Sequence, residues 1–137
     1  MTEFEKQVGR ELTAALDAFV RGDPEPYKTL WSRADDVSLF GAFGGRVFGW
    51  GAVADRLDRA ASQYRSGRYE QFDILVASAG TEFGYMVWIE AISAEGVDGQ
   101  RVTRQRRATQ VFRLELGEWR IVHQHSDPLV ELQLPAS

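Results

Sequence analysis

The sequence predicts an α+β fold in which a curved antiparallel sheet wraps around helices from the first half of the chain. Three observations lead to this prediction. Apolar residues recur every three or four positions in segments before residue 66, and the period changes to two after Arg68. Short breaks separate the four alternating segments, and strands joined by short connections pair as antiparallel neighbours. The length of 137 residues is typical of one domain, which we expect to span residues 1–137.

The helical part of this prediction rests on three amphipathic segments. The first helix is expected over residues 2–21, where one apolar stripe consists of Phe4, Val8, Leu12, Ala15, Leu16 and Phe19. Asp23 followed by Pro24 fits an N-cap and the first position of a second, shorter helix. The third helix is expected over residues 51–65, with an apolar side made of Val53, Leu57, Ala60, Ala61 and Tyr64.

The strand part begins with a predicted hairpin. Val37–Phe40 and Arg46–Trp50 are short β-prone runs, and Gly44 and Gly45 between them can supply the turn. Four longer segments with period-two alternation follow, at residues 69–77, 82–93, 107–116 and 118–126. The sheet is therefore expected to hold a long meander whose apolar face lies on the helices.

Composition and charge exclude several classes of function. The net charge is −4, and the only local basic cluster is formed by Arg104, Arg106 and Arg107, so we expect no nucleic-acid partner. The chain has no cysteine, which excludes disulfides, thiolate metal sites and a cysteine nucleophile. No apolar run approaches the roughly 20 residues that span a bilayer, and the start, MTEFEKQVGR, is charged. We therefore expect no membrane partner and a cytoplasmic location.

Three stretches of the chain resemble a known superfamily. They are FVRGDPEPYKTLWSRADDVSLFG, FGWGAVADRL and RATQVFRLELGEWRIVHQHSD, at residues 19–41, 48–57 and 107–127. The chain resembles the nuclear transport factor two-like superfamily and, within it, the SnoaL-like group. The last stretch is also similar to the association domain of calcium/calmodulin-dependent kinase II. The resemblance implies a cone-shaped, cystatin-like α+β barrel with a pocket on its concave side, usually in a dimer, and it covers enzymes as well as proteins without chemistry.

The resemblance also suggests which residues line the pocket. Positions that carry basic pocket residues in the kinase association domain fall on Glu90, Gln110 and Ser126. Because none of these residues is basic, this chain is not expected to bind anions in the way that the kinase domain does. Strand alternation groups Trp88 with Glu90 and Gln110 with Phe112, although alternation alone does not say which face is concave. The expected ligand-binding residues are Trp50, Tyr64, Trp88, Glu90, Gln110, Phe112 and Ser126.

Glu90 is the first candidate for proton transfer because it lies in the apolar strand centre YMVWIEAI. A carboxyl group buried there has a raised pKa unless a cation pairs with it, and such a group can serve as general acid or base. The alternative is an ion pair with Arg107 or another arginine. We expect the ion pair, and therefore expect Glu90→Gln to lower the melting temperature.

His123 and His125 are the only histidines, and alternation predicts that they share a face with Trp119 and Ile121. His123 is the second candidate for proton transfer. A zinc-type site needs further ligands that no other histidine or cysteine can supply, so neither a metal nor another cofactor is expected. By the resemblance, the histidines would lie on the convex face, where these proteins dimerise.

These observations leave three functions open, of which we expect the first. The first is a small-molecule-binding or accessory domain whose mainly apolar pocket takes a small apolar or amphipathic ligand. The second is an enzyme of the isomerase, cyclase or dehydratase type that uses Glu90 or His123. The third is a dimeric assembly module. An unpaired Glu90 facing open space would favour the enzyme, whereas an arginine partner would favour the other two. In each case we expect a homodimer formed through the convex apolar set Tyr85, Val87, Ile89, Val111 and Ile121.

Overall fold

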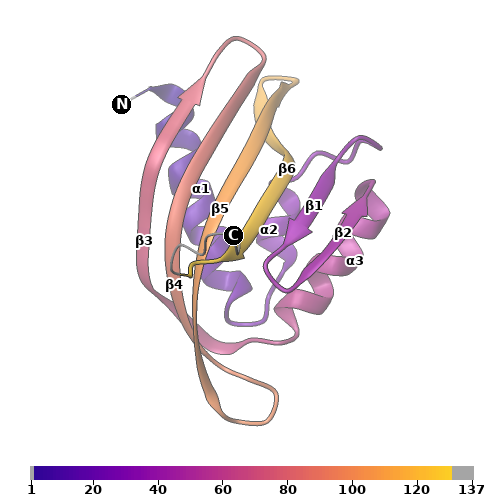
Figure 1. Ribbon diagram of the computed structural model, residues 1–137. Coiled ribbons are helices and arrows are strands. Elements are labelled where there is room, and N and C mark those ends of the chain that lie inside the picture. The colour runs from indigo at the N-terminus through magenta and orange to yellow at the C-terminus, as the bar shows by residue number, and fades with distance from the viewer. Residues whose placement is uncertain (1, 131–137) are drawn as a thin grey trace, which may run out of the picture.

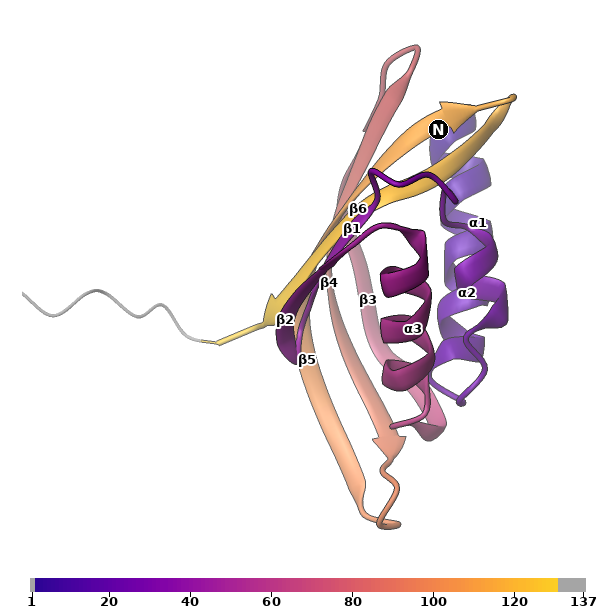
Figure 2. The same ribbon diagram turned by 90° about the vertical axis from the view of Figure 1, so that its right-hand side faces the viewer.

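Helices cover one face of a curved sheet in the computed structural model, which describes residues 2–130 (Figures 1 and 2). The helices are α1 (Glu3–Phe19), α2 (Glu25–Thr29) and α3 (Trp50–Ala61). The strands are β1 (Ser38–Gly41), β2 (Gly44–Phe48), β3 (Arg65–Ala79), β4 (Phe83–Glu95), β5 (Arg101–Glu115) and β6 (Glu118–Pro128). The expected α+β fold is confirmed, and no helix lies on the convex face of the sheet in the part of the chain described (Figure 2).

The sheet is mixed rather than wholly antiparallel, which corrects the expectation. Its strand order is β2-β1-β6-β5-β4-β3, and β1 pairs with β6 in parallel while every other neighbouring pair is antiparallel. The reason lies in the connection through α3, which carries the chain from β2 to the far edge of the sheet. The meander from β3 to β6 then returns to β1, and its last strand arrives in the same direction as β1 (Figure 1).

The β4–β5 hairpin is longer than the alternation predicts. β5 begins at Arg101, whereas the expected strand begins at Arg107. The added residues RVTRQR contain a single aliphatic side chain and carry no period-two signal, but Glu95 pairs with Arg101 and Glu90 with Arg106 across the ladder. This extension brings Arg104 and Arg106 into the sheet.

The end of α1 fixes the start of β3 and so closes one side of the fold. All six residues of the expected apolar stripe of α1 are buried. The Gly67 backbone N–H donates to the Val20 carbonyl over 3.0 Å. A Cβ atom at position 67 would lie 2.2 Å from that carbonyl oxygen, so only glycine allows this approach. The strand therefore passes directly under the C-terminal end of α1.

A β-bulge in β6 changes which side chains face inward. Val111 pairs with His123 but Phe112 pairs with Ile121, so Val122 is the extra residue. Ile121 is fully buried, which places it on the inner face. The prediction that Ile121 shares a face with His123 and His125 is therefore wrong, and so is its assignment to the convex apolar set. Beyond the bulge, Ser126 faces inward and the histidines face outward.

Candidate functional site

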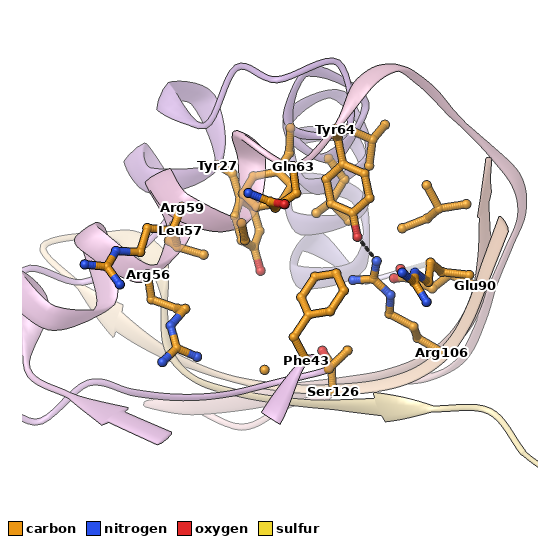
Figure 3. A pocket seen from close by; sticks show the side chains of 18 of the residues that line it. Tyr27, Phe43, Arg56, Leu57, Arg59, Gln63, Tyr64, Glu90, Arg106 and Ser126 are labelled. Atoms are coloured by element: carbon orange, nitrogen blue, oxygen red, sulfur yellow. Dashed lines mark hydrogen bonds between the residues drawn. The ribbon is translucent and has the colours of Figure 1, made fainter. Parts of the chain in front are cut away.

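A cavity of about 570 Å³ lies between the concave face of the sheet and the helices (Figure 3). Its wall comes from α1, α2 and α3, from the β1–β2 turn, and from β3 to β6. The inner part is lined mainly by apolar and aromatic residues, among them Leu16, Phe19, Val20, Leu39 and Ile92. This volume falls within the range of pockets that hold small organic molecules.

Glu90 is the one charged side chain in the inner part of the described cavity wall, and it is only 6% exposed. It lies two residues after Trp88 on β4, so strand alternation points both side chains inward. The indole Nε1 of Trp88 donates to Glu90 Oε1 over 2.7 Å. Burial raises the pKa of Glu90 to about 7, and the indole hydrogen bond offsets only part of that rise.

The expected ion pair between Glu90 and Arg107 is wrong. Arg107 faces Ile89 across the ladder, on the outer side of the sheet, and pairs there with Asp127 at 2.5 Å. Arg106 faces Glu90 across the ladder, but its guanidinium donates to the Tyr64 hydroxyl (Figure 3). Within residues 2–130, Glu90 makes no ion pair. Its carboxyl group is therefore buried without a cation in hydrogen-bonding contact.

Tyr27, Gln124 and Ser126 form a neutral polar part of the inner wall, and Gln110 joins them by hydrogen bonds from outside the lining. Gln110 Nε2 donates to the Tyr27 hydroxyl oxygen at 2.5 Å and to Gln124 Oε1 at 2.8 Å. The Tyr27 hydroxyl donates to the same Gln124 oxygen, and Gln124 Nε2 donates to Ser126 Oγ over 2.8 Å. Burial raises the pKa of Tyr27 far above its usual value, with the charge of Glu90 adding to the rise. Tyr27 therefore keeps its proton at neutral pH.

Arginine and aromatic side chains surround the opening of the cavity. Phe43, in the β1–β2 turn, is 58% exposed. The guanidinium carbons of Arg104 and Arg106 lie 5.6 and 5.3 Å from the centre of its ring. Arg56 and Arg59 line the opposite side from α3 (Figure 3). The entrance is thus more basic than the net charge of the chain suggests.

The structure divides the expected ligand-binding residues into two groups. Tyr64, Trp88, Glu90 and Ser126 line the cavity. The others lie outside its lining, and they are Trp50, Gln110 and Phe112. Trp50 stacks under the Arg33 guanidinium at 4.0 Å, Phe112 packs edge-on against Phe4 at 5.3 Å, and Gln110 supports Tyr27 from behind.

Sequence reasoning did not identify Tyr27, Gln124 or Arg106 as site residues. Tyr27 lies in a five-residue helix whose periodicity is too short to show which side chain faces the sheet. Gln124 lies two residues before the expected site residue Ser126 on β6, so alternation places both on one face, but it is not among the expected site residues. Arg106 lies outside the predicted strand. The arginine cluster in the sequence was the one available signal for Arg106.

His123 lies on the outer face, away from the cavity. Its Nδ1 is 2.7 Å from Ser38 Oγ, and the ring of Phe40 packs edge-on against both histidines. Burial lowers the pKa of His123, and the neighbouring His125 lowers it further. Within residues 2–130, no group of three or more histidine, aspartate and glutamate side chains is placed to hold a metal ion. Nor is any helix among the described residues both long enough and apolar enough to cross a membrane.

Comparisons with solved structures support the fold. A candidate dehydratase of the NTF2-like family from Streptomyces avermitilis is 24% identical, with a TM-score of 0.78 and coverage of 92% of this chain and 96% of that one. An NTF2-like superfamily protein from Salmonella enterica subsp. enterica serovar Typhimurium str. LT2 is 18% identical, with a TM-score of 0.77 and coverage of 96% and 98%. The association domain of CaMKII from C. elegans is 18% identical, with a TM-score of 0.63 and coverage of 90% and 94%.

Sequence comparison identifies the family. No curated protein matches the chain. The family described as the SnoaL-like domain matches residues 8–131, which is most of the sequence. The expected resemblance is therefore confirmed, and the chain belongs to the SnoaL-like domain family.

Proposed function

We propose that the chain binds a small, mainly apolar molecule in the cavity and that Glu90 transfers a proton to or from it. The observation that carries this proposal is the burial of Glu90 in the cavity wall without an arginine partner. A carboxyl group whose pKa is about 7 is partly ionised at neutral pH, so it can both accept and return a proton. This favours an enzyme of the isomerase, cyclase or dehydratase type over a binding domain without chemistry.

The rest of the cavity suits such a reaction. Its apolar lining would exclude water from the transferred proton, and a protonated Tyr27 can donate to a ligand oxygen that replaces Gln124 as acceptor. His123 lies across the sheet from the cavity, so the proposal assigns proton transfer to Glu90 alone. A dehydratase, the class suggested for the Streptomyces avermitilis protein of similar fold, also needs a group that removes a proton.

A second proposal concerns the convex face, where we infer that two copies of the chain pair. Within the described residues no helix covers this face, and its apolar side chains remain partly exposed. Tyr85 is 44% exposed and Phe83 is 52% exposed, beside Val87, Ile89 and Val111 on neighbouring positions of β4 and β5. Exposed apolar areas of this kind usually mark contact surfaces. The similar fold of the CaMKII association domain, which by its name serves assembly, agrees with a dimer.

Solvent hydrogen exchange tests the proposed chemistry without knowledge of the natural substrate. Wild-type protein, incubated in D₂O with a panel of small apolar ketones and esters, should speed deuterium incorporation next to the carbonyl group of those that bind. Glu90→Gln should still bind the same compounds but lose at least about 100-fold of the rate, because the amide cannot accept the proton. NMR measures both binding and exchange. If compounds bind the cavity of the wild type but show no deuterium exchange, the protein is a binding domain and the proposed enzyme activity is wrong.

The stability of Glu90→Gln should depend on pH in a defined direction. Between pH 4.5, the ordinary pKa, and pH 7, the folded wild type retains a proton that the unfolded chain releases, so its stability falls as pH rises. Above pH 7 this loss, about 3 kcal/mol, is complete. The Glu90→Gln variant does not lose stability in this way, because its amide does not titrate, and its amide oxygen can still accept the hydrogen bond from the Trp88 indole. It should therefore be clearly more stable than the wild type at pH 8 but similar to it at pH 4.5.

Urea denaturation at the two pH values measures this difference, with Glu11→Gln on the exposed side of α1 as the control for the same chemical change. This expectation reverses the one made from the sequence, because the arginine partner that it assumed does not pair with Glu90. A Glu90→Gln protein that is less stable than wild type at pH 8 would mean that a cation supports Glu90 in solution.

The dimer should separate when a charge enters the convex face. Tyr85→Glu places a carboxylate in the middle of the apolar surface, where burying it against a second copy would cost several kcal/mol. Sedimentation velocity should show a dimer for the wild type and a monomer for Tyr85→Glu at micromolar concentration. Leu116→Glu, at the fully exposed β5–β6 turn, is the matched control and should stay dimeric. A monomeric wild type would exclude the proposed interface.

A further inference from the structure

The entrance of the cavity holds a partly buried cation without an acidic partner. Arg106 extends from the inner face of β5 and donates to the hydroxyl of Tyr64, which is itself only 2% exposed. Among residues 2–130, no carboxylate lies within ion-pairing distance of its guanidinium. Burial lowers the pKa of Arg106 to about 10, which still leaves it charged at neutral pH.

Such a guanidinium lacks most of the hydrogen bonds that it can make. It carries five N–H donors, and a single neutral hydroxyl satisfies one of them. Charges that are partly removed from water are normally paired with an opposite charge, because pairing replaces the hydration that they lose. The unused donors of Arg106 lie on the cavity wall, where a bound anion would meet them.

Two aromatic rings lie beside the guanidinium of Arg106. Its guanidinium carbon lies 5.3 Å from the Phe43 ring centre and 5.6 Å from the Tyr64 ring centre (Figure 3). Contacts of this type favour the charged guanidinium and restrict its orientation. A positioned guanidinium binds a planar anion with less loss of conformational freedom than a mobile one.

The charges nearby select for an anion of one negative charge. Arg104 and Arg56 also line the cavity and raise the local positive potential, which Asp98 on the same wall lowers only in part. Glu90 pairs with Arg106 across the β4–β5 ladder, so its negative form would repel a second charge on the ligand. A carboxylate matches both conditions, since it carries a single charge and two oxygens in the plane of the guanidinium fork.

We propose that the ligand of this cavity is an apolar carboxylic acid whose carboxylate binds Arg106 and whose apolar body extends to the inner wall. The inference rests on the proposed use of the cavity as a ligand site. Glu90 lies on the same cavity wall, opposite Arg106 in the β4–β5 ladder, so the apolar body of the ligand would pass close to it.

A matched pair of probes tests this inference. Phenylbutyrate and phenylbutyramide share their apolar part and differ in the charged end group. Isothermal titration and NMR should show that the wild type binds phenylbutyrate at least about tenfold more tightly than the amide. Arg106→Gln should reduce this preference to less than about threefold without weakening the binding of the amide. Arg107→Gln, on the outer face one residue away, is the control and should retain the wild-type preference.

The outcomes separate this inference from the proposed function. Equal binding of both probes to the wild type would overturn the carboxylate assignment while leaving the cavity as a ligand site. A preference for phenylbutyrate that survives in Arg106→Gln would assign the anion to another residue and overturn the role of Arg106. Binding of neither probe at millimolar concentration would overturn both the inference and the cavity as a ligand site. Melting curves establish that each variant is folded, and Arg106→Lys, which keeps the charge, should regain part of the preference.

Discussion

Among the described residues, one hydrogen bond, from the Trp88 indole, holds Glu90 in a mainly apolar part of the cavity, and the properties of the site follow from that arrangement. One neutral donor replaces only a small part of the hydration that an ionised carboxylate loses on burial. The proton is therefore retained up to about neutral pH. A nearby cation in direct contact would remove this property, so the turn of Arg106 toward Tyr64 is as important for the site as the burial of Glu90 itself.

The fold creates this environment through three local features. The close approach of Gly67 to Val20 brings β3 under α1 and encloses the apolar end of the cavity. The bulge at Val122 returns Ser126 to the inner face after a buried Ile121. The extended β4–β5 hairpin supplies the charged entrance. The cavity consequently has an apolar end, a neutral polar wall and a basic opening, an arrangement suited to an amphipathic molecule that enters with its charged end outward.

The sequence predicts the elements whose side chains alternate or repeat in a regular way. The apolar stripe of α1 was correct at each residue, and alternation correctly grouped Trp88 with Glu90. Features without a periodic signal were missed. A bulge adds one residue to β6 and leaves no mark in the composition, so the partners assigned to His123 and His125 were wrong. The polar start of β5 is stabilised by pairing with the buried strand β4, which is tertiary information that a single-strand pattern does not contain.

The site was harder to predict than the fold because it depends on which of two possible partners each charged group contacts. From the sequence, an ion pair between Glu90 and an arginine is the expected outcome. Arg107 is excluded only when alternation is combined with the resemblance that places Glu90 and Gln110 on one face, because Arg107 then falls on the other face, where the structure has it. Arg106 is on the correct face, but its contact with Tyr64 depends on where the chain leaves α3, which only the three-dimensional structure shows. The contacts of charged groups at a cavity can therefore be assigned only from a three-dimensional structure, whereas apolar stripes can be recognised in the sequence.

Direct titration of Glu90 is the measurement that tests this account most clearly. Protein with ¹³C-labelled glutamate side chains can be followed by NMR across the pH range, and Glu90→Gln identifies the Glu90 carboxyl resonance by its disappearance. A midpoint near pH 7 is expected for this resonance, because Glu90 is buried without a cation in contact. A midpoint at or below the ordinary glutamate value of 4.5 would show that a cation or water stabilises the ionised form, and the proposed role of Glu90 in proton transfer would then be contradicted.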